Sequence, residues 1–298
     1  MVRTNRAALA VIGGSKAYDL LRDNGFGKEE KKEIVKTPYG PAASARLFHG
    51  DGYHYWFMSR HGEKGYDTAA AYVNYRANIW ALKKLGVERI VSWSGPGAVN
   101  PAIAPGDFAV PHDAIDMTRN RASNFFEGTG LGFIRMSEPF CPEIRAAAIA
   151  GIAATGAGAR DRGVYLCTEG PRLETAAEIK MFGQWGADLV GMTLLPEAFL
   201  ARQMEMCYAA VCYCTNYAEG VVARDFREGE LFEGMLSAAE KEKVEDAVFR
   251  FPHVIAETLH RLSRRERGCK CGVAMERYRR EGRAGDLLQL AKSCAKKS

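Results

Sequence analysis

The sequence has no apolar run of the roughly 18 residues that a membrane-spanning helix requires. It also has no internal repeat and no low-complexity segment. A short apolar stretch at 7–12 follows Arg3 and Arg6. It is too short for an export signal, and it continues into Gly13-Gly14 rather than into a small-residue cleavage site. These absences exclude membrane-spanning, collagen-like and mostly disordered proteins, and we expect a cytoplasmic protein.

Cysteine occurs at eight positions, but never in the C-x2-C pairs typical of structural zinc sites. Five of these residues lie in apolar or mixed segments and are interpreted as small buried hydrophobes: Cys141, Cys167, Cys207, Cys212 and Cys214. Cys269 and Cys271 form a C-x-C, with Cys294 behind, and this is the only group that the sequence offers to a metal. The pattern favours reduced thiols and no metal site.

Negative charge is scarce at one end of the chain. The net charge is +5, whereas residues 263–298 hold 11 Lys/Arg against 4 Asp/Glu, which is +7. A basic surface, if one exists, therefore belongs to this tail. Solvated charge runs are common, so we favour a solvated basic helix over 273–292, docked on an oligomer. A nucleic-acid or partner contact through its arginines, Arg277, Arg279, Arg280 and Arg283, is the less favoured hypothesis.

Strand and helix patterns alternate along the 298-residue chain. Apolar runs predict strands at 6–12, 45–48, 53–59, 89–93, 108–111, 164–167, 189–190 and 208–214. Helical spacing predicts helices at 73–85, 142–155, 175–185, 196–205 and 237–262. Strand–helix alternation with several strand–strand steps predicts a three-layer α/β domain with a mixed central sheet over 1–262. A basic, helical C-terminal extension would follow over 263–298.

Four predicted strands end in small polar residues, and such ends form the usual ligand crevice of α/β sheets. Gly13-Gly14-Ser15 could bind an anion, although Gly-Gly is more often a plain turn. Arg60 and His61 could both donate to one small dianion, with His61 either neutral or charged. The alternative is a surface salt bridge for Arg60 and a structural role for His61. Ser94 and Thr193 offer hydroxyls at two further strand ends.

Glu174 and Asn216 also lie just beyond predicted strands. A carboxylate and an amide placed there could together bind the edge of a heterocycle. The alternative is that Glu174 caps a helix and Asn216 caps a turn. Met192 could pack under a sugar ring, although a methionine beside a strand end is usually core. Gly95 would leave room for such a sugar.

Taken together, these motifs resemble the trimeric purine nucleoside phosphorylase and methylthioadenosine phosphorylase family. The resemblance extends from about residue 9 to about residue 262. The most specific segments are Glu169-Gly170-Pro171-Arg172 and residues 186–197, with Arg60-His61-Gly62 and residues 74–82 in support. The resemblance implies a cytoplasmic pentosyltransferase of purine salvage. Such an enzyme uses inorganic phosphate as co-substrate and needs no metal or other cofactor.

The resemblance also implies roles for individual residues. Phosphate would be held by Ser15, Arg60, His61, Ser94 and Thr193. The nucleoside would contact Gly95, Leu173, Glu174, Met192 and Asn216. Phosphate would attack C1′ of an oxocarbenium-like sugar while Asn216 stabilises the departing purine, with Arg60 and His61 as the other catalytic residues.

Two residues predict the base. An ionised carboxylate only accepts hydrogen bonds. Hypoxanthine and guanine present N1–H to Glu174, whereas adenine presents a bare acceptor. The family's adenine-preferring branch carries Asp where this chain has Asn216. We therefore expect a 6-oxopurine nucleoside (methylthioinosine, inosine or guanosine), with methylthioadenosine as the alternative.

The resemblance implies a homotrimer in which a neighbouring subunit's Phe133 closes the 5′ pocket, together with residues 221–236. Departures from the family pattern at Lys16, Gly65 and Pro96 concern phosphate affinity. They leave open a non-catalytic nucleoside-binding regulatory protein with the same fold, and also a phosphate-independent nucleosidase.

Overall fold

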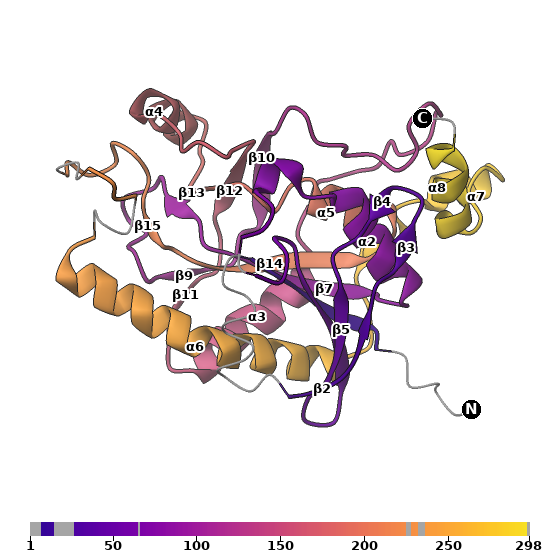
Figure 1. The fold of residues 1–298 in the computed structure, drawn as a ribbon, viewed down its shortest axis with the longest axis horizontal. Helices are drawn as coiled ribbons and strands as arrows, with labels where there is room; N and C mark the ends of the chain where they lie inside the picture. Colours follow the sequence, from indigo (N-terminus) through magenta and orange to yellow (C-terminus); the bar gives the residue numbers. More distant parts are fainter. Residues whose placement is uncertain (1–6, 15–26, 65, 225–227, 232–235, 297–298) are drawn as a thin grey trace.

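A mixed sheet runs through the molecule in the computed structural model, which describes residues 7–14, 27–64, 66–224, 228–231 and 236–296 (Figure 1). β1, β6, β7 and β14 run parallel at its centre. β9 pairs antiparallel with β14 and parallel with β11, and β5 pairs antiparallel with both β6 and β2. The carboxyl ends of the central strands therefore meet at one edge. The strand order is β11 (Ala159–Arg160), β9 (Phe108–Ala109), β14 (Cys207–Tyr213), β7 (Arg89–Ser94), β1 (Leu9–Gly13), β6 (His54–Ser59), β5 (Ala45–His49) and β2 (Lys28–Glu33).

A smaller second sheet stands beside this edge, and β12 and β13 run parallel within it. Its carboxyl ends supply two more loops to the same region. The strand order is β10 (Asp113–Met117), β12 (Val164–Thr168), β13 (Leu189–Gly191), β8 (Gly97–Ala98) and β15 (Asn216–Tyr217). A short hairpin, β3 (Lys36–Thr37) and β4 (Gly40–Pro41), lies apart from both sheets.

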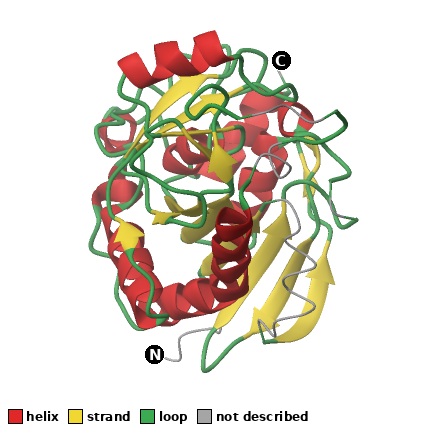
Figure 2. Ribbon diagram, turned by 90° about the vertical axis from the view of Figure 1, so that its left-hand side faces the viewer, coloured by secondary structure: helices red, strands yellow, loops and turns green. Residues whose placement is uncertain are grey.

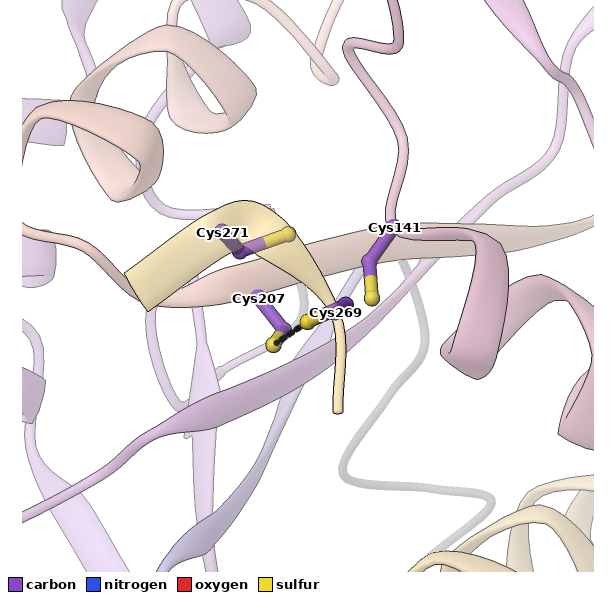
Figure 3. A group of neighbouring side chains, drawn as sticks. All are labelled: Cys141, Cys207, Cys269 and Cys271. Carbon is purple, nitrogen blue, oxygen red and sulfur yellow. Dashed lines mark hydrogen bonds between the residues drawn. The ribbon is translucent and has the colours of Figure 1, made fainter. Parts of the chain in front are cut away.

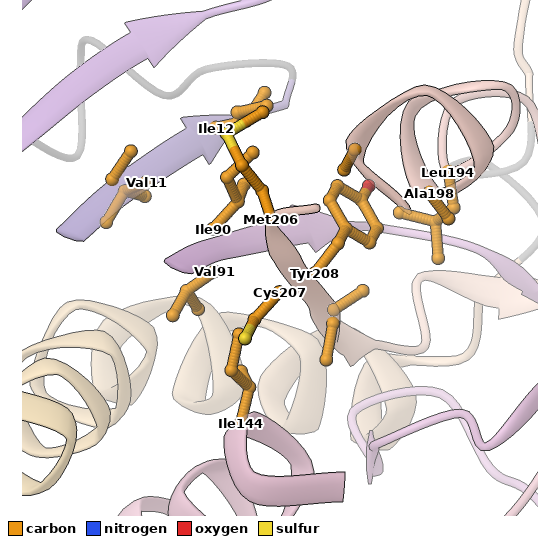
Figure 4. Close-up of a cluster of buried hydrophobic side chains, with 14 of the residues drawn as sticks. Val11, Ile12, Ile90, Val91, Ile144, Leu194, Ala198, Met206, Cys207 and Tyr208 are labelled. Carbon is orange, nitrogen blue, oxygen red and sulfur yellow. The ribbon is translucent and has the colours of Figure 1, made fainter. Parts of the chain in front are cut away.

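Helices cover both faces of the large sheet. α3 (Pro142–Ala154) packs on α6 (Ala238–Ser263) and on β14, and α5 (Glu197–Gln203) packs on β14 and α2 (Tyr75–Lys84). Successive side chains of β14 alternate between these layers. Cys207 points toward Ile144 of α3, while Tyr208 points toward Leu194 and Ala198 near α5 (Figure 4). This arrangement is the three-layer α/β fold that the sequence predicts.

The predicted helices form, and two of them begin with a capping box. α4 (Ala176–Gln184) starts at a capping box made by Thr175 and Glu178. α6 starts at a second box made by Ser237 and Glu240 and continues through Pro252. Figure 1 shows this long helix along the lower side of the molecule, and Figure 2 shows the helices and strands from the side. Among the described residues, no helix has the length and apolar character needed to cross a bilayer.

The C-terminal extension differs from its prediction. Instead of one solvated helix over 273–292, it forms η3 (Lys270–Val273), α7 (Glu276–Arg280) and α8 (Leu287–Ala295). Gly282, at φ +69°, ends the first helical part, and Asp286 caps α8 through two backbone N–H groups. Several side chains of the extension are buried in the main core: Cys271, Met275, Tyr278, Leu287, Ala291 and Cys294.

The four arginines proposed as a partner surface are all paired within the chain. Arg277 and Arg283 contact Glu281, and Arg280 contacts Glu276. Arg279 donates to Glu205 of the main domain. The extension is thus docked on its own chain through an apolar face, and these four arginines are paired.

Candidate active site

Six strand ends surround one cavity of about 680 Å³, a size suited to a small-molecule ligand. The large sheet contributes the residues after β1, β6, β7 and β14, and the small sheet those after β12 and β13. Eight predicted site residues line the cavity together: Arg60, His61, Ser94, Gly95, Leu173, Glu174, Met192 and Thr193. Asn216 lines it as well. Ser15, Lys16 and Gly65 lie outside the described residues.

Gly14 lines the cavity. A Cβ at this position would lie 3.0 Å from Cδ1 of Trp93. The glycine therefore has a packing reason beyond a plain turn. Directly beside it, the backbone N–H of Arg60 donates to the carbonyl of Gly13 at 3.2 Å. The ends of β1 and β6 are thereby fixed to each other.

Arg60 is buried and is held by four hydrogen bonds. Its Nε and Nη2 donate to the two carboxylate oxygens of Glu197 at 2.8 and 2.9 Å. Nη2 also donates to Ser92 Oγ at 2.5 Å, and Nη1 to the Trp93 carbonyl at 3.0 Å. A guanidinium has five N–H groups, so one N–H on Nη1 has no partner among the described residues. The surface salt bridge weighed for Arg60 is wrong, because this pair is buried.

Glu197 is fully buried and also accepts a hydrogen bond from Tyr208 Oη at 2.7 Å. Burial alone would lower the pKa of Arg60, but the charge of Glu197 and the hydrogen bonds to it raise that pKa above its ordinary value. Arg60 therefore stays cationic although it is buried away from solvent. The bidentate geometry sets the plane of its guanidinium.

His61 is buried, and its Nδ1 lies 2.8 Å from the carbonyl of Thr68. A carbonyl only accepts, so Nδ1 carries the proton. Burial, together with the nearby charges of Arg60 and Arg121, lowers the pKa of His61 to about 4. The ring is neutral at pH 7, and its Nε2 is an acceptor. In this neutral form the ring has no free N–H for the anion that the sequence analysis assigns to it. Tyr66 stacks on it at 4.5 Å between centroids.

Hydroxyls from two strand ends adjoin these groups. Ser94 Oγ lies 3.1 Å from Tyr165 Oη, and Thr193 Oγ1 donates to Ser94 Oγ at 3.4 Å. All three side chains are buried. With Arg60 and His61, they form a polar end of the cavity that has donors for a small anion and one acceptor.

Two further polar residues of the cavity lining are Glu174 and Asn216. Glu174 Oε1 accepts a hydrogen bond from Thr168 Oγ1 at 2.5 Å, and Oε2 has no partner among the described residues. Since Thr175 and Glu178 cap α4, the capping role considered for Glu174 is wrong. Asn216 accepts from Thr215 Oγ1 at 2.6 Å and donates through Nδ2 to the Tyr217 carbonyl at 2.8 Å. These two contacts fix the amide and leave one N–H of Nδ2 available.

Arg121, which the sequence interpretation missed, holds the walls of this end in place. Its guanidinium donates to the carbonyls of Thr168, Glu169, Met192 and Leu195 at 2.6–3.1 Å. It thereby joins the loops after β12 and β13. The carbonyl of Met192 accepts one hydrogen bond from this guanidinium. An isolated arginine between polar residues gave no signal in the sequence.

Comparisons with known proteins agree with this geometry. The sequence profile of the Phosphorylase superfamily matches residues 8–248. The chain belongs to this family. It is 41% identical over 275 residues to the 6-oxopurine nucleoside phosphorylase of Pyrococcus furiosus, covering 90% of this chain and 97% of that protein. It is 40% identical over 267 residues to a probable S-methyl-5′-thioinosine phosphorylase of Methanothermobacter thermautotrophicus, covering 90% and 88%.

Solved structures show the same nucleoside phosphorylase fold. A methylthioadenosine phosphorylase from an Antarctic soil metagenomic library superposes with a TM-score of 0.82 at 26% identity, over 98% of this chain and 99% of that one. The predicted family and fold class are therefore confirmed.

Proposed function

We propose that this protein cleaves the N-glycosidic bond of a 6-oxopurine nucleoside with inorganic phosphate. The products would be the free base and a ribose 1-phosphate or 5-methylthioribose 1-phosphate. The observation that carries the proposal is one cavity lined by two sets of polar residues. We assign Arg60, His61, Ser94 and Thr193 to phosphate, as its anion-binding end, and Glu174 and Asn216 to the base, as its base-reading end. The names of the relatives, which include both 6-oxopurine and methylthioinosine enzymes, support it.

At the anion-binding end, phosphate would receive hydrogen bonds from the available N–H of Arg60 and from the hydroxyls of Ser94 and Thr193. Ser15 is proposed to join them from outside the described residues. Neutral His61 would accept a hydrogen bond through Nε2 from the protonated oxygen of monohydrogen phosphate. A phosphate oxygen then forms its bond to C1′ as the C1′–N9 bond breaks, and it offsets the positive charge that develops on the sugar.

At the base-reading end, the electron pair of the broken bond leaves on the purine. The available N–H of Asn216 would donate to the N7 and O6 edge, where this charge develops. Glu174 Oε2 would accept N1–H. An adenine would place its bare N1 against this carboxylate, leaving two acceptors facing each other. A site built to hydrogen-bond one substrate strongly rejects an analogue that leaves its polar groups unpaired. The 6-oxopurine nucleosides are therefore the first candidates, and methylthioadenosine is the second.

We propose that a neighbouring copy of the chain closes the 5′ side of the pocket. The Phe133 ring is 87% exposed and does not line its own cavity. Tyr278 holds the Phe133 main chain at both its N–H and its carbonyl. We propose a homotrimer in which this ring closes the neighbour's 5′ pocket. Of residues 221–236, Leu231 and Glu230 line the cavity, while Phe226, Phe232 and Met235 lie outside the described residues.

The test is a turnover assay on methylthioinosine, inosine, guanosine and methylthioadenosine, each with and without phosphate. We expect phosphate-dependent release of hypoxanthine or guanine and slow release of adenine. Glu174→Gln should narrow the ratio of 6-oxo to 6-amino turnover, because an amide can also donate. Glu245→Gln, at an exposed position on α6, is the matched control. Fastest release of adenine by the wild type would contradict the base assignment.

Binding of nucleoside without turnover of any substrate would favour the regulatory protein. Turnover that is indifferent to phosphate would favour a nucleosidase. Both outcomes would overturn the proposed reaction while leaving the family membership intact.

A further inference from the structure

Four cysteines from three distant segments meet at the junction between the main domain and the C-terminal extension. Cys141 precedes α3, Cys207 begins β14, and Cys269 and Cys271 lie at the start of η3 and within it. Their four Sγ atoms all lie within 4.8 Å of one another. Figure 3 shows the side chains gathered between these segments. None of the four lines the active-site cavity.

The size and composition of this group match a tetrahedral thiolate site. With zinc–sulfur bonds of about 2.3 Å, the sulfur atoms of a zinc site made of four cysteines are about 3.8 Å apart. The Cys207 and Cys269 sulfurs are 3.2 Å apart, well beyond the roughly 2.05 Å of a disulfide bond. All eight cysteines of the chain lie in its described part, and all are free thiols there. Small side-chain movements would bring the four sulfurs to zinc distance.

The surroundings carry the charge that such a site needs. Four thiolates around one divalent cation leave a net charge of −2, which requires nearby cations when it is buried. Arg267 interacts electrostatically with Cys207, Cys269 and Cys271, and Arg202 with Cys271. The Nε of Arg267 is buried and has no hydrogen-bond partner among the described residues. The guanidinium of Arg267 thus lies beside these thiols, where it would offset part of the negative charge of bound thiolates.

We propose that Cys141, Cys207, Cys269 and Cys271 bind one structural Zn²⁺ that fastens the C-terminal extension to the main domain. Two ligands belong to the extension and two to the core, so the ion closes a loop between them. The sequence offered only the C-x-C pair with Cys294. The fold instead supplies Cys141 and Cys207 and leaves Cys294 in α8, outside the group. The four ligands leave no open position, which is the mark of a structural and not a catalytic zinc site.

The experiment uses the full chain, purified under reducing conditions and dialysed against metal-free buffer after loading with zinc. Elemental analysis and native mass spectrometry should show one zinc per chain. A Cys269→Ala/Cys271→Ala double variant should fall to background, and Cys294→Ala, a buried cysteine of the extension outside the group, should keep its zinc. Cys271→His should retain zinc, because three cysteines and one histidine are an equally good ligand set.

A second measurement follows the extension directly. A chelator should accelerate tryptic cleavage within residues 264–296 by on the order of tenfold, and added zinc should restore protection. The Cys294→Ala variant should respond to the chelator as the wild type does. A wild-type chain without zinc, an intact mass that shows disulfide bonds between these cysteines, or full zinc content in the double variant would each overturn the proposal.

Discussion

The ion pair between Arg60 and Glu197 gives the sharpest prediction about the anion-binding end. Glu197→Gln removes the buried negative charge and leaves Arg60 charged among apolar neighbours. The NH2 group of the new amide would face a hydrogen-bond donor, so at least one of the four hydrogen bonds to Glu197 is lost. Removing one partner of a buried ion pair costs about 3–5 kcal/mol. For a domain of this size, that corresponds to a fall in Tm of about 10 °C.

The assay is denaturant unfolding followed by tryptophan fluorescence, with phosphate KM measured on the folded fraction. The matched control is Glu257→Gln, which removes a pair to Arg261 whose side chains are both 43% exposed and should cost ~0.5 kcal/mol or less. Glu197→Gln should also raise KM for phosphate more than KM for nucleoside, because the plane of Arg60 is no longer fixed. If both variants unfold with free energies within about 1 kcal/mol of each other, the buried pair does not stabilise the site in the way described.

Three further predictions concern the remaining polar groups. Asn216→Asp should shift the inosine-to-adenosine ratio of kcat/KM toward adenosine by about tenfold or more, and an unchanged ratio would contradict the base-reading role. The pKa of His61 is lowered from 6.5 to about 4, so its contribution to stability is complete above pH 6.5 and is lost as the pH falls toward 4. That loss is worth about 3 kcal/mol, and His61→Gln should remove this part of the pH dependence of unfolding; an identical pH profile would refute it. Arg121→Lys should raise nucleoside KM and lower stability on the order of 3 kcal/mol, because an ammonium cannot reach four carbonyls, and wild-type behaviour would show that Arg121 does not position the loops.

The central strands were predictable from the sequence because they are buried and apolar. The edge strands were not. β2 has the sequence Lys28-Glu29-Glu30-Lys31-Lys32-Glu33 and pairs only with β5, so its charged side chains face solvent and give no apolar signal. β10 was missed for the same reason, since it forms the edge of the small sheet and carries two aspartates. The extension was mispredicted because its two short helices were merged across Gly282 and Gly285.

The candidate site was predictable where residues follow strand ends in recognisable motifs. Contacts between segments far apart in the sequence were not. Glu197 lies 137 residues from Arg60, and no local pattern pairs the two. The neutral state of His61 depends above all on burial, which the sequence does not display. The cysteine group likewise required the fold to bring Cys141 and Cys207 to the C-x-C pair.

The most direct test of the account is the fate of phosphate in the reaction. ³¹P NMR of the wild-type protein with methylthioinosine or inosine should show inorganic phosphate converted to a sugar 1-phosphate, in equal amount to the hypoxanthine released. Release of hypoxanthine with free sugar and unchanged phosphate, or no release at all with nucleoside bound, would contradict the proposed phosphorolysis.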